Sequence, residues 1–316
     1  MRARQAFHVG EASAYRSAGL TEKARAHERR ARYYARFGDG EQALGWAELA
    51  AGPECTDAEG TTWTKMADGS SCTVFETKYV AKIFRTPDAG MIKQEVSIVN
   101  ALGDLAPSFG RYVHSPSGAV IGYTMERMHV ALDEHMTKEV AKGRPALSEA
   151  MQKEVLGVIR GVCEHATCLD IKPANFALTR KGDVRMIDLG ADFCAVSEKD
   201  DTYEARVRFC VLLFCTSVCT KGSDDRLLSL HVLLGLLLDE RGDPLPEARA
   251  ELEKIDNDEL FATERLSENI RTGNCVGHFA KGKNTRIARV MNTGMLHPKA
   301  LLDYLSDHVK AKRGAA

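Results

Sequence analysis

Residues 168–190 of this 316-residue chain read C-L-D-I-K-P-A-N-F-A-L-T-R-K-G-D-V-R-M-I-D-L-G. The loop at the start of this stretch carries Asp170, Lys172 and Asn175, and a second acid, Asp188, stands near its end. A carboxylate can take the proton of a hydroxyl group, and a lysine can neutralise a phosphoryl group that is being transferred. Amide and carboxylate oxygens are ligands that Mg²⁺ accepts. The stretch therefore indicates a site for metal and phosphate.

Two apolar runs lie between the loop and the second acid. They cover 176–179 and 184–187, and the letters R-K-G-D between them predict a turn that joins two strands. A surface turn in which Pro173 ends a helix would explain the letters D-I-K-P alone. It would not explain the second acid, so the functional interpretation is preferred.

The letters D-x-K-P-x-N followed by D-L-G resemble the catalytic loop and metal-binding turn of eukaryotic-type protein kinases. The form in this chain is most similar to the divergent Ser/Thr kinases of large DNA viruses. The resemblance implies that Asp170 and Lys172 are catalytic residues. It also implies that Asn175 and Asp188 bind metal, with ATP and Mg²⁺ as cofactors.

The resemblance covers residues 61–190 and has departures. Cys168 and Leu169 stand where the family usually has His and Arg. Because that Arg normally receives an activation-loop phosphate, its loss implies activity that such phosphorylation does not gate. After Gly190 the family's A-P-E and D-x-W landmarks are absent, which implies a shortened or remodelled platform for a peptide substrate.

A nucleotide site is implied by three segments before the loop. The letters M-A-D-G-S-S-C-T-V-F at 66–75 line up with the kinase glycine-rich loop, with one glycine kept, and Y-V-A-K-I follows with Lys82. A helix predicted over 88–102 carries Glu95, thirteen residues after Lys82, as the candidate partner of that lysine. The letters T-M-E-R-M at 124–128 resemble the hinge that offers backbone groups to adenine. The residues implied to bind nucleotide are Gly69, Ser70, Ser71, Cys72, Val74, Ala81, Lys82, Glu95, Glu126 and Met128.

The N-terminal residues differ in composition from the rest of the chain. Residues 1–52 contain no proline, and four small or aromatic residues recur after a constant interval: Tyr15, Gly19, Ala24 and Ala31 recur as Tyr34, Gly38, Ala43 and Ala50. Small residues at these places let antiparallel helices approach closely. The pattern resembles the tetratricopeptide type of helical module, so 1–52 are predicted to form a small three-helix module. Residues 53–60 are predicted to be a turn-rich linker.

Composition excludes several classes of protein. A formal net charge of −1 gives no general attraction to nucleic acid or anionic membranes. The nine cysteines include no C-x-x-C pair, which argues for a reducing compartment with cysteines as small core residues rather than a disulfide framework. The most apolar stretches, 209–220 and 227–238, are shorter than the ~20 residues of a membrane span and are predicted to be buried helices. A soluble, intracellular protein is expected.

Together these features predict an α+β protein of two-lobed, protein-kinase-like fold, preceded by the helical module. The β-rich small lobe would cover 61–128 and the larger, divergent helical lobe 129–316. The expected function is ATP- and Mg²⁺-dependent phosphoryl transfer to Ser or Thr of a protein substrate. Three alternatives remain open: a small-molecule kinase, a pseudokinase scaffold, or a protein whose N-terminal helices, binding a partner protein, are the main functional part. No specific nucleic acid or membrane partner is expected, and the oligomeric state is not predicted.

Overall fold

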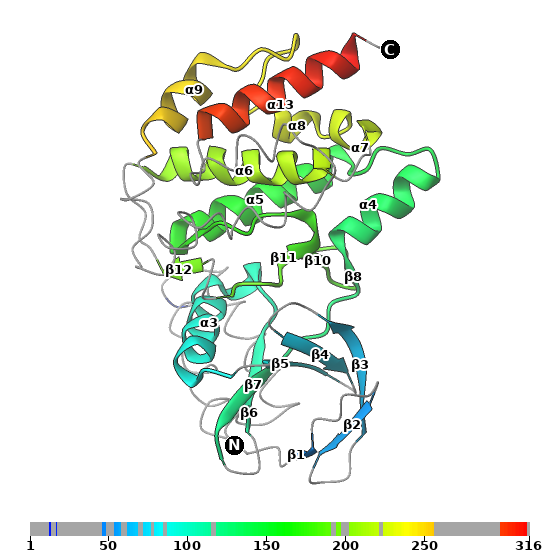
Figure 1. The fold of residues 1–316 in the computed structure, drawn as a ribbon, viewed down its shortest axis with the longest axis vertical. Helices are drawn as coiled ribbons and strands as arrows, with labels where there is room; N and C mark the ends of the chain where they lie inside the picture. Colours follow the sequence, from blue (N-terminus) through cyan, green and yellow to red (C-terminus); the bar gives the residue numbers. More distant parts are fainter. Residues whose placement is uncertain are drawn as a thin grey trace. The chain divides into compact units, whose positions relative to one another are not determined.

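The computed structural model divides the chain into two compact units, Met1–Arg127 (unit 1) and Met128–Ala316 (unit 2). The fold is α+β, as predicted, with an antiparallel sheet in unit 1 and mostly helices in unit 2 (Figure 1). The unit boundary falls one residue before the predicted lobe boundary. The structure describes Ser13, Ser17, 46–48, 54–57, 62–68, 72–76, 79–84, 87–114, 118–190, 194–196, 202–220, 224–255 and 298–314.

Unit 1 is organised by a seven-stranded sheet with the order β1-β2-β3-β4-β5-β7-β6, in which every neighbouring pair is antiparallel. Helix α3 packs against β6 and β7. The described elements are β1 (Trp46–Glu48), β2 (Glu54–Asp57), β3 (Thr62–Asp68), β4 (Cys72–Glu76), β5 (Val80–Phe84), α3 (Ala89–Leu102), the 3₁₀ turn Gly103–Leu105, β6 (Phe109–His114) and β7 (Val120–Met125).

The two faces of this sheet have different roles because successive side chains of a strand point to opposite sides. One face buries an apolar cluster formed by Trp63, Phe75, Ala81, Ile83, Val113 and Ile121. Val80 and Lys82 alternate with Ala81 and Ile83 along β5, so they belong to the opposite face. The same alternation in β4 puts Val74 opposite Lys82 in the pairing of the two strands. The sheet thus separates an apolar core from a face that carries the lysine.

Helix α3 forms where the sequence predicts it. The side chain of Asp88 accepts a hydrogen bond from the Met91 N–H (3.0 Å), which caps the first turn. The helix ends at Gly103, whose φ of 59° is favourable for glycine because it has no Cβ. Glu95 lies on the buried side of this helix among apolar residues. The predicted helix over 88–102 is confirmed.

The strands β1 and β2 differ from the prediction. They lie in ranges assigned to the helical module and to the linker, yet β2 pairs with β3 and β1 pairs with β2. Strands of three and four residues carry little sequence signal, and here their hydrogen bonds come from the neighbouring strand. Within 1–45 only Ser13 and Ser17 are described, and both are helical, with the Ser17 hydroxyl donating to the Ser13 carbonyl (3.0 Å). The remainder of the predicted module lies outside the described residues.

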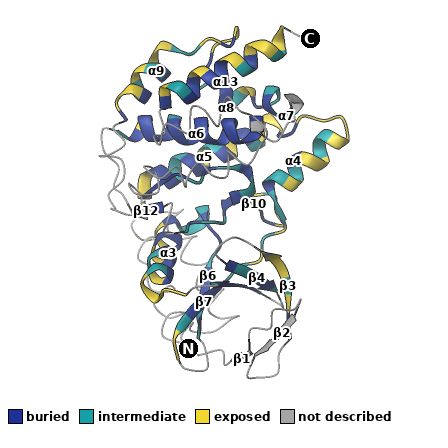
Figure 2. Cartoon of the chain, in the orientation of Figure 1, coloured by how far each residue is buried: buried dark blue, intermediate teal, exposed yellow. Residues whose placement is uncertain are grey.

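Unit 2 is organised by helix α6, which packs against α5 on one side and against α9 and α13 on the other (Figure 1). Every residue from 209 to 219 is buried (Figure 2). Its described elements are β8 (Val130–Ala131), α4 (Leu132–Ala141), α5 (Glu149–His165), β9 (Ala166–Cys168), the 3₁₀ turn Pro173–Asn175, β10 (Phe176–Leu178), β11 (Val184–Met186), β12 (Cys194–Val196), α6 (Tyr203–Thr220), α7 (Asp224–Leu228), α8 (His231–Leu234), α9 (Pro246–Glu253) and α13 (Pro298–Arg313).

The two apolar stretches behave differently. Residues 209–220 lie in the buried helix α6, as predicted, whereas 227–238 are not one helix but the end of α7, all of α8 and turns. The helix is interrupted between α7 and α8 by two side-chain hydrogen bonds. The Ser229 hydroxyl donates to the Arg226 carbonyl (2.8 Å), and the Gln152 side chain accepts from the Val232 N–H (2.9 Å). These polar contacts end one helix and cap the next. Among the described helices, none combines the length and the apolar character needed to cross a membrane.

Two glycines allow a test of the packing. A Cβ added at Gly122 in β7 would lie 2.1 Å from the Lys82 carbonyl oxygen on the paired strand, whereas a Cβ at Gly157 in α5 meets nothing within 4 Å. Gly122→Ala should destabilise the protein by about 1–3 kcal/mol, since the strands must shift apart. Gly157→Ala should stabilise it by about 1 kcal/mol because glycine is a poor helix former. Thermal unfolding of the two variants checks this, and equal midpoints would contradict the strand packing.

Candidate active site

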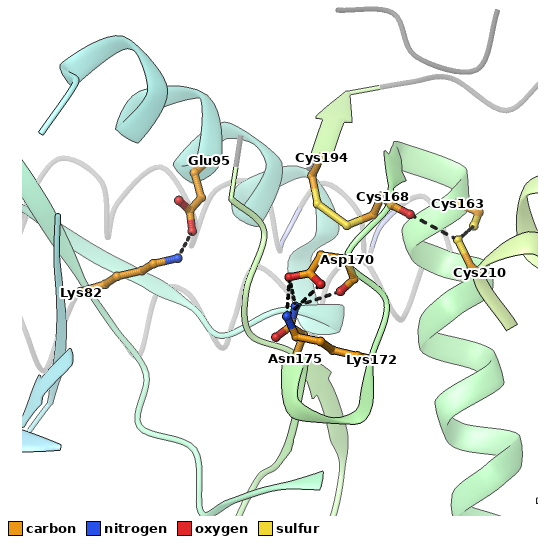
Figure 3. Close-up of a disulfide and its surroundings, with 9 residues drawn as sticks. All are labelled: Lys82, Glu95, Cys163, Cys168, Asp170, Lys172, Asn175, Cys194 and Cys210. Carbon is orange, nitrogen blue, oxygen red and sulfur yellow. Dashed lines mark hydrogen bonds and ion pairs between the residues drawn. A yellow bond between two sulfur atoms is a disulfide. The ribbon is translucent and has the colours of Figure 1, made fainter. Parts of the chain in front are cut away.

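In unit 1 a buried ion pair joins the sheet to α3. The Lys82 ammonium lies 2.7 Å from Glu95 Oε1, and both residues are almost fully buried (Figure 3). The Tyr123 hydroxyl donates to the same carboxylate oxygen (2.8 Å) from β7, the strand that neighbours β5. A lysine and a glutamate buried together require each other, because removing one leaves an uncompensated charge. The pairing expected from the sequence is therefore present, and Tyr123 is a further member that the sequence did not reveal.

The residues around this pair divide between the two faces of the sheet. Cys72 and Val74 in β4 share the face of Lys82, as the predicted nucleotide residues should. Ala81 does not, since it is fully buried in the apolar cluster on the other face, and its assignment to nucleotide binding is corrected. Val80, which lies two residues before the lysine, shares the lysine's face instead. The period-two alternation of strands was the signal that could have identified it. Gly69, Ser70 and Ser71 lie outside the described residues.

The predicted hinge residues flank the boundary between the units. The Glu126 N–H donates to the Ser108 carbonyl (2.9 Å), and the Glu126 carboxylate accepts from the Ser108 N–H (3.3 Å). These two bonds fix the backbone of Glu126 beside the start of β6. Met128 is the first residue of unit 2 and is partly buried. Their contribution to adenine binding stays a prediction.

In unit 2 the loop after β9 draws three polar side chains together. Both carboxylate oxygens of Asp170 lie 2.8 Å from the Lys172 ammonium. The Asn175 amide nitrogen donates to Asp170 Oδ2 and to the Asp170 carbonyl oxygen, each at 2.8 Å (Figure 3). The two charged side chains are partly exposed, at 13% for Asp170 and 22% for Lys172. The three predicted residues thus form one connected cluster that solvent can reach.

The buried residues that alternate with this cluster hold the loop in place. Ile171 is 1% exposed, and the 3₁₀ turn that contains Asn175 begins at Pro173, a residue suited to the start of a helical turn. Phe176 follows in β10 and packs edge-on against Phe214 of α6, with ring centroids 5.5 Å apart. The loop that carries the polar cluster is therefore held by residues packed in the core of unit 2.

The second acid is tied to the same loop through the backbone. Strands β10 and β11 form the predicted hairpin, with Phe176 paired to Met186. Immediately after β11 the Ile187 N–H donates to the Asn175 carbonyl (2.8 Å). Because Asp188 follows Ile187 directly, this bond fixes the chain that carries the second acid beside Asn175. Asp188 is partly exposed.

The donor set fits a small divalent cation that is completed by phosphate oxygens. Since the Asn175 amide nitrogen donates to Asp170, the oxygen of that amide remains to accept or to coordinate. An amide oxygen and the Asp188 carboxylate are hard ligands of the kind Mg²⁺ prefers, and Mg²⁺ is usually bound by one or two such groups together with substrate phosphates. Among the described residues, no group of three or more His, Cys, Asp or Glu side chains could hold a metal without such help.

The cysteines only partly follow the prediction. Five described cysteines are buried and not disulfide-bonded, as expected of small core residues: Cys72, Cys163, Cys210, Cys215 and Cys219. Cys168 and Cys194, however, form a disulfide (Figure 3). They are directly opposite each other in the antiparallel pair β9–β12, with Cα atoms 4.3 Å apart, so cross-strand pairing supplies the proximity. The two cysteines are 26 positions apart in the sequence, and this spacing did not predict their pairing.

The Leu169 side chain itself offers no charge to a phosphate. Leu169 is 2% exposed and packs in the core. Tyr203 is buried at the start of α6, where its hydroxyl donates to the Arg160 carbonyl (3.3 Å) and burial raises the pKa of the phenol. A guanidinium nitrogen of Arg206 does lie 3.3 Å from the Thr202 hydroxyl. Independence from activation-loop phosphorylation stays a prediction.

No family model matches the chain, and a search of curated proteins finds no match either. Two sets of residues therefore indicate the function. One is the buried ion pair of unit 1, and the other is the loop cluster of unit 2 with its tethered acid.

Proposed function

We propose that this chain is a phosphotransferase that moves the γ-phosphoryl group of ATP, with Mg²⁺, to a Ser or Thr hydroxyl of a protein substrate. The observation that carries the proposal is the unit 2 cluster, in which Asp170, Lys172 and Asn175 are joined at 2.8 Å. Phosphoryl transfer needs a base for the hydroxyl, a cation for the phosphoryl oxygens and ligands for a metal. The cluster supplies one group of each kind within a single loop.

Each side chain of the cluster has a distinct role in the proposal. Asp170 accepts the proton of the acceptor hydroxyl, and its hydrogen bonds hold its carboxylate in one orientation. Lys172 keeps a positive charge beside that carboxylate, where the transferred group would need neutralisation. Asn175 orients the base through its nitrogen and offers its oxygen to the metal. Asp188 is the second metal ligand, and the bound ion would bridge and neutralise phosphate oxygens.

In unit 1 the proposal assigns nucleotide binding to the face of the sheet that carries Lys82. The lysine would pair with the α- and β-phosphates while Glu95 and Tyr123 hold its ammonium in position. Val74 and Val80 supply apolar surface on the same face, suited to the base of the nucleotide. Backbone groups of Glu126 and Met128 would meet the adenine edge. A kinase-like architecture for the two units belongs to this proposal.

The alternative functions differ in the molecule that accepts the phosphoryl group and in whether any transfer occurs. A small-molecule kinase would phosphorylate metabolites but no protein, and a pseudokinase would bind nucleotide without transferring phosphate. Purified full-length protein is incubated with γ-labelled ATP and Mg²⁺ against a protein mixture and, separately, a metabolite panel. Label on Ser or Thr of proteins supports the proposal. Label on metabolites alone, or nucleotide binding without transfer, would replace it with one of the alternatives.

Replacing Lys82 tests the unit 1 assignment. Lys82→Met should lower transfer by about 10²-fold or more, because a preorganised cation is lost from the phosphates. Lys93→Met is the control, because Lys93 is an exposed residue of α3, and it should leave the rate unchanged. Thermal unfolding of both variants is recorded, since Glu95 loses its partner in the first. If folded Lys82→Met protein transfers phosphate as fast as the control, the lysine is not part of the site.

A further inference from the structure

The disulfide encloses the residues that the proposal makes catalytic or metal-binding: Asp170, Lys172, Asn175 and Asp188. Cys168 lies two positions before Asp170 and Cys194 lies six positions after Asp188, so the bond closes a covalent ring around the loop, the hairpin β10–β11 and the second acid. The two cysteines are nearly inaccessible, at 1% and 0% exposure. The disulfide thus constrains this region locally and does not link it to a distant part of unit 2.

The strand that carries Cys194 is short. Strand β12 has three residues, paired with β9 at Ala166, Thr167 and Cys168. The Cys194 N–H donates to the carbonyl of Gly190, which lies two residues after the second acid (3.0 Å). A strand this short contributes little pairing energy by itself. The disulfide is therefore the strongest described connection between the loop and the segment that follows Asp188.

The Cys210 thiol would not rearrange this bond. The Cys210 Sγ lies 3.6 Å from the Cys168 carbonyl oxygen and 3.6 Å from the Cys163 Sγ (Figure 3). Contact with Cys163 and complete burial raise the pKa of the Cys210 thiol, which keeps it protonated. A protonated thiol is a poor nucleophile toward a disulfide. The thiol that opens the bond is therefore taken to come from solution and not from Cys210.

We propose that Cys168 and Cys194 form a reversible thiol–disulfide modification site whose oxidised state holds the catalytic loop and the second acid in their working arrangement. This regulatory meaning rests on the proposed phosphotransferase function. Five described cysteines are buried and not disulfide-bonded, beside a single described disulfide, which supports reversibility. Proteins that keep most cysteines reduced usually carry disulfides that are transient or regulatory. The reagent class is a low-molecular-weight thiol of the glutathione type or a dithiol.

The chemistry is two-electron exchange. A thiolate of the reductant attacks one sulfur, the S–S bond breaks, and the other cysteine leaves as a thiolate that takes a proton. A second reductant thiol then displaces the first from the mixed disulfide. The products are two cysteine thiols and one oxidised small disulfide, so the hydrogens of two reductant thiols end on Cys168 and Cys194. Because both residues are buried, the reductant reaches them only when β12 separates from β9.

The first measurement concerns the bond alone. Folded full-length protein is equilibrated in glutathione buffers of stepwise ratio, quenched, denatured, alkylated and mapped by mass spectrometry. Cys168 and Cys194 should change together from a linked peptide pair to two alkylated thiols, while Cys163 and Cys210 remain thiols throughout. Circular dichroism should show that the reduced protein stays folded. A bond that opens only in denaturant would overturn reversibility, and alkylation of both cysteines in oxidising buffer would overturn the site.

The second measurement concerns the effect on the loop. Hydrogen exchange at the β9 amides should be faster in reduced than in oxidised protein, and phosphoryl transfer should fall by between about 5-fold and 100-fold on reduction, since small displacements of reacting groups are costly. Cys168→Ser/Cys194→Ser should match the reduced rate and ignore reductant. Cys219→Ser is the control, because a serine hydroxyl can keep the hydrogen bond that the Cys219 thiol makes to the Cys215 carbonyl.

The two readouts separate the two proposals. Protein without transfer activity in either redox state would refute the phosphotransferase function. The hydrogen-exchange experiment would still show whether the disulfide restrains the loop. Equal exchange and equal rates in both states would overturn the inference even if the enzyme is active. A faster reduced enzyme would also overturn it, because the disulfide would then restrain the loop in an inactive arrangement.

Discussion

Asp170→Asn is expected to lower the rate of phosphoryl transfer by about 10²- to 10⁴-fold while ATP affinity remains nearly unchanged, the range typical of a lost general base. The carboxylate accepts hydrogen bonds from the Lys172 ammonium and the Asn175 amide. An asparagine at position 170 would have one acceptor oxygen and would turn an NH₂ group toward one of those two donors. It also could not take the proton of the acceptor hydroxyl. Both the chemistry and the orientation of the cluster would suffer.

Initial rates with γ-labelled ATP and ATP affinity by calorimetry are the two measurements for this variant. Asp303→Asn is a matched control, since Asp303 also pairs with a cation, Arg249 at 2.8 Å, but on the exposed side of α13. An exposed pair contributes about 0–1 kcal/mol, so the control should retain wild-type activity and fold. Turnover in Asp170→Asn that equals the control would mean that another base acts or that the acceptor needs none.

Asp188→Asn has the second large expected effect, on metal-dependent binding. The affinity for ATP with Mg²⁺ should fall by at least about 10-fold and transfer should be abolished, because a neutral amide is a much weaker ligand for a hard cation than a carboxylate. The affinity for ATP without metal should not fall, since the removed charge is negative. The hydrogen bond from the Ile187 N–H to the Asn175 carbonyl holds the backbone beside Asp188, so the backbone is not free to bring another ligand to the same place.

Calorimetric titrations with and without Mg²⁺ separate these effects, with Asp303→Asn again as the control. The informative quantity is the ratio of the two affinities, because a general loss of structure would lower both. A ratio equal to that of the wild-type protein would show that the metal is held by other residues. That outcome would also remove the role proposed for the Asn175 oxygen.

The parts of the site that could be predicted from sequence are those fixed by local spacing. Asp170, Lys172 and Asn175 lie within six consecutive positions, so one loop conformation suffices to bring them together. Lys82 lies in β5 and Glu95 in α3, the next helix along the chain, whose start is marked by Asp88. In both cases the chain between the partners has a strong local preference.

The parts that could not be predicted depend on contacts between segments distant in the chain. The disulfide follows from the pairing of β9 with β12, and β2 exists as a strand because β3 offers it hydrogen bonds. Tyr123 reaches Glu95 through the register of β5 and β7. Ala81 was misassigned for a simpler reason, since strand alternation alone places it opposite the lysine. Part of the predicted helical module of 1–52 is wrong, since residues 46–48 form a strand that pairs with β2.

The burial of α6 has a consequence for biosynthesis. Its apolar surface is covered partly by α5, which precedes it, and partly by α9 and α13, which follow it. A nascent chain therefore cannot complete this core until it has been translated at least through Arg313 and that segment has left the ribosome. Unit 1, whose described sheet is complete by Met125, has no such delay. Until α13 docks, an emerging unit 2 exposes the face of α6 on which a chaperone would be needed most.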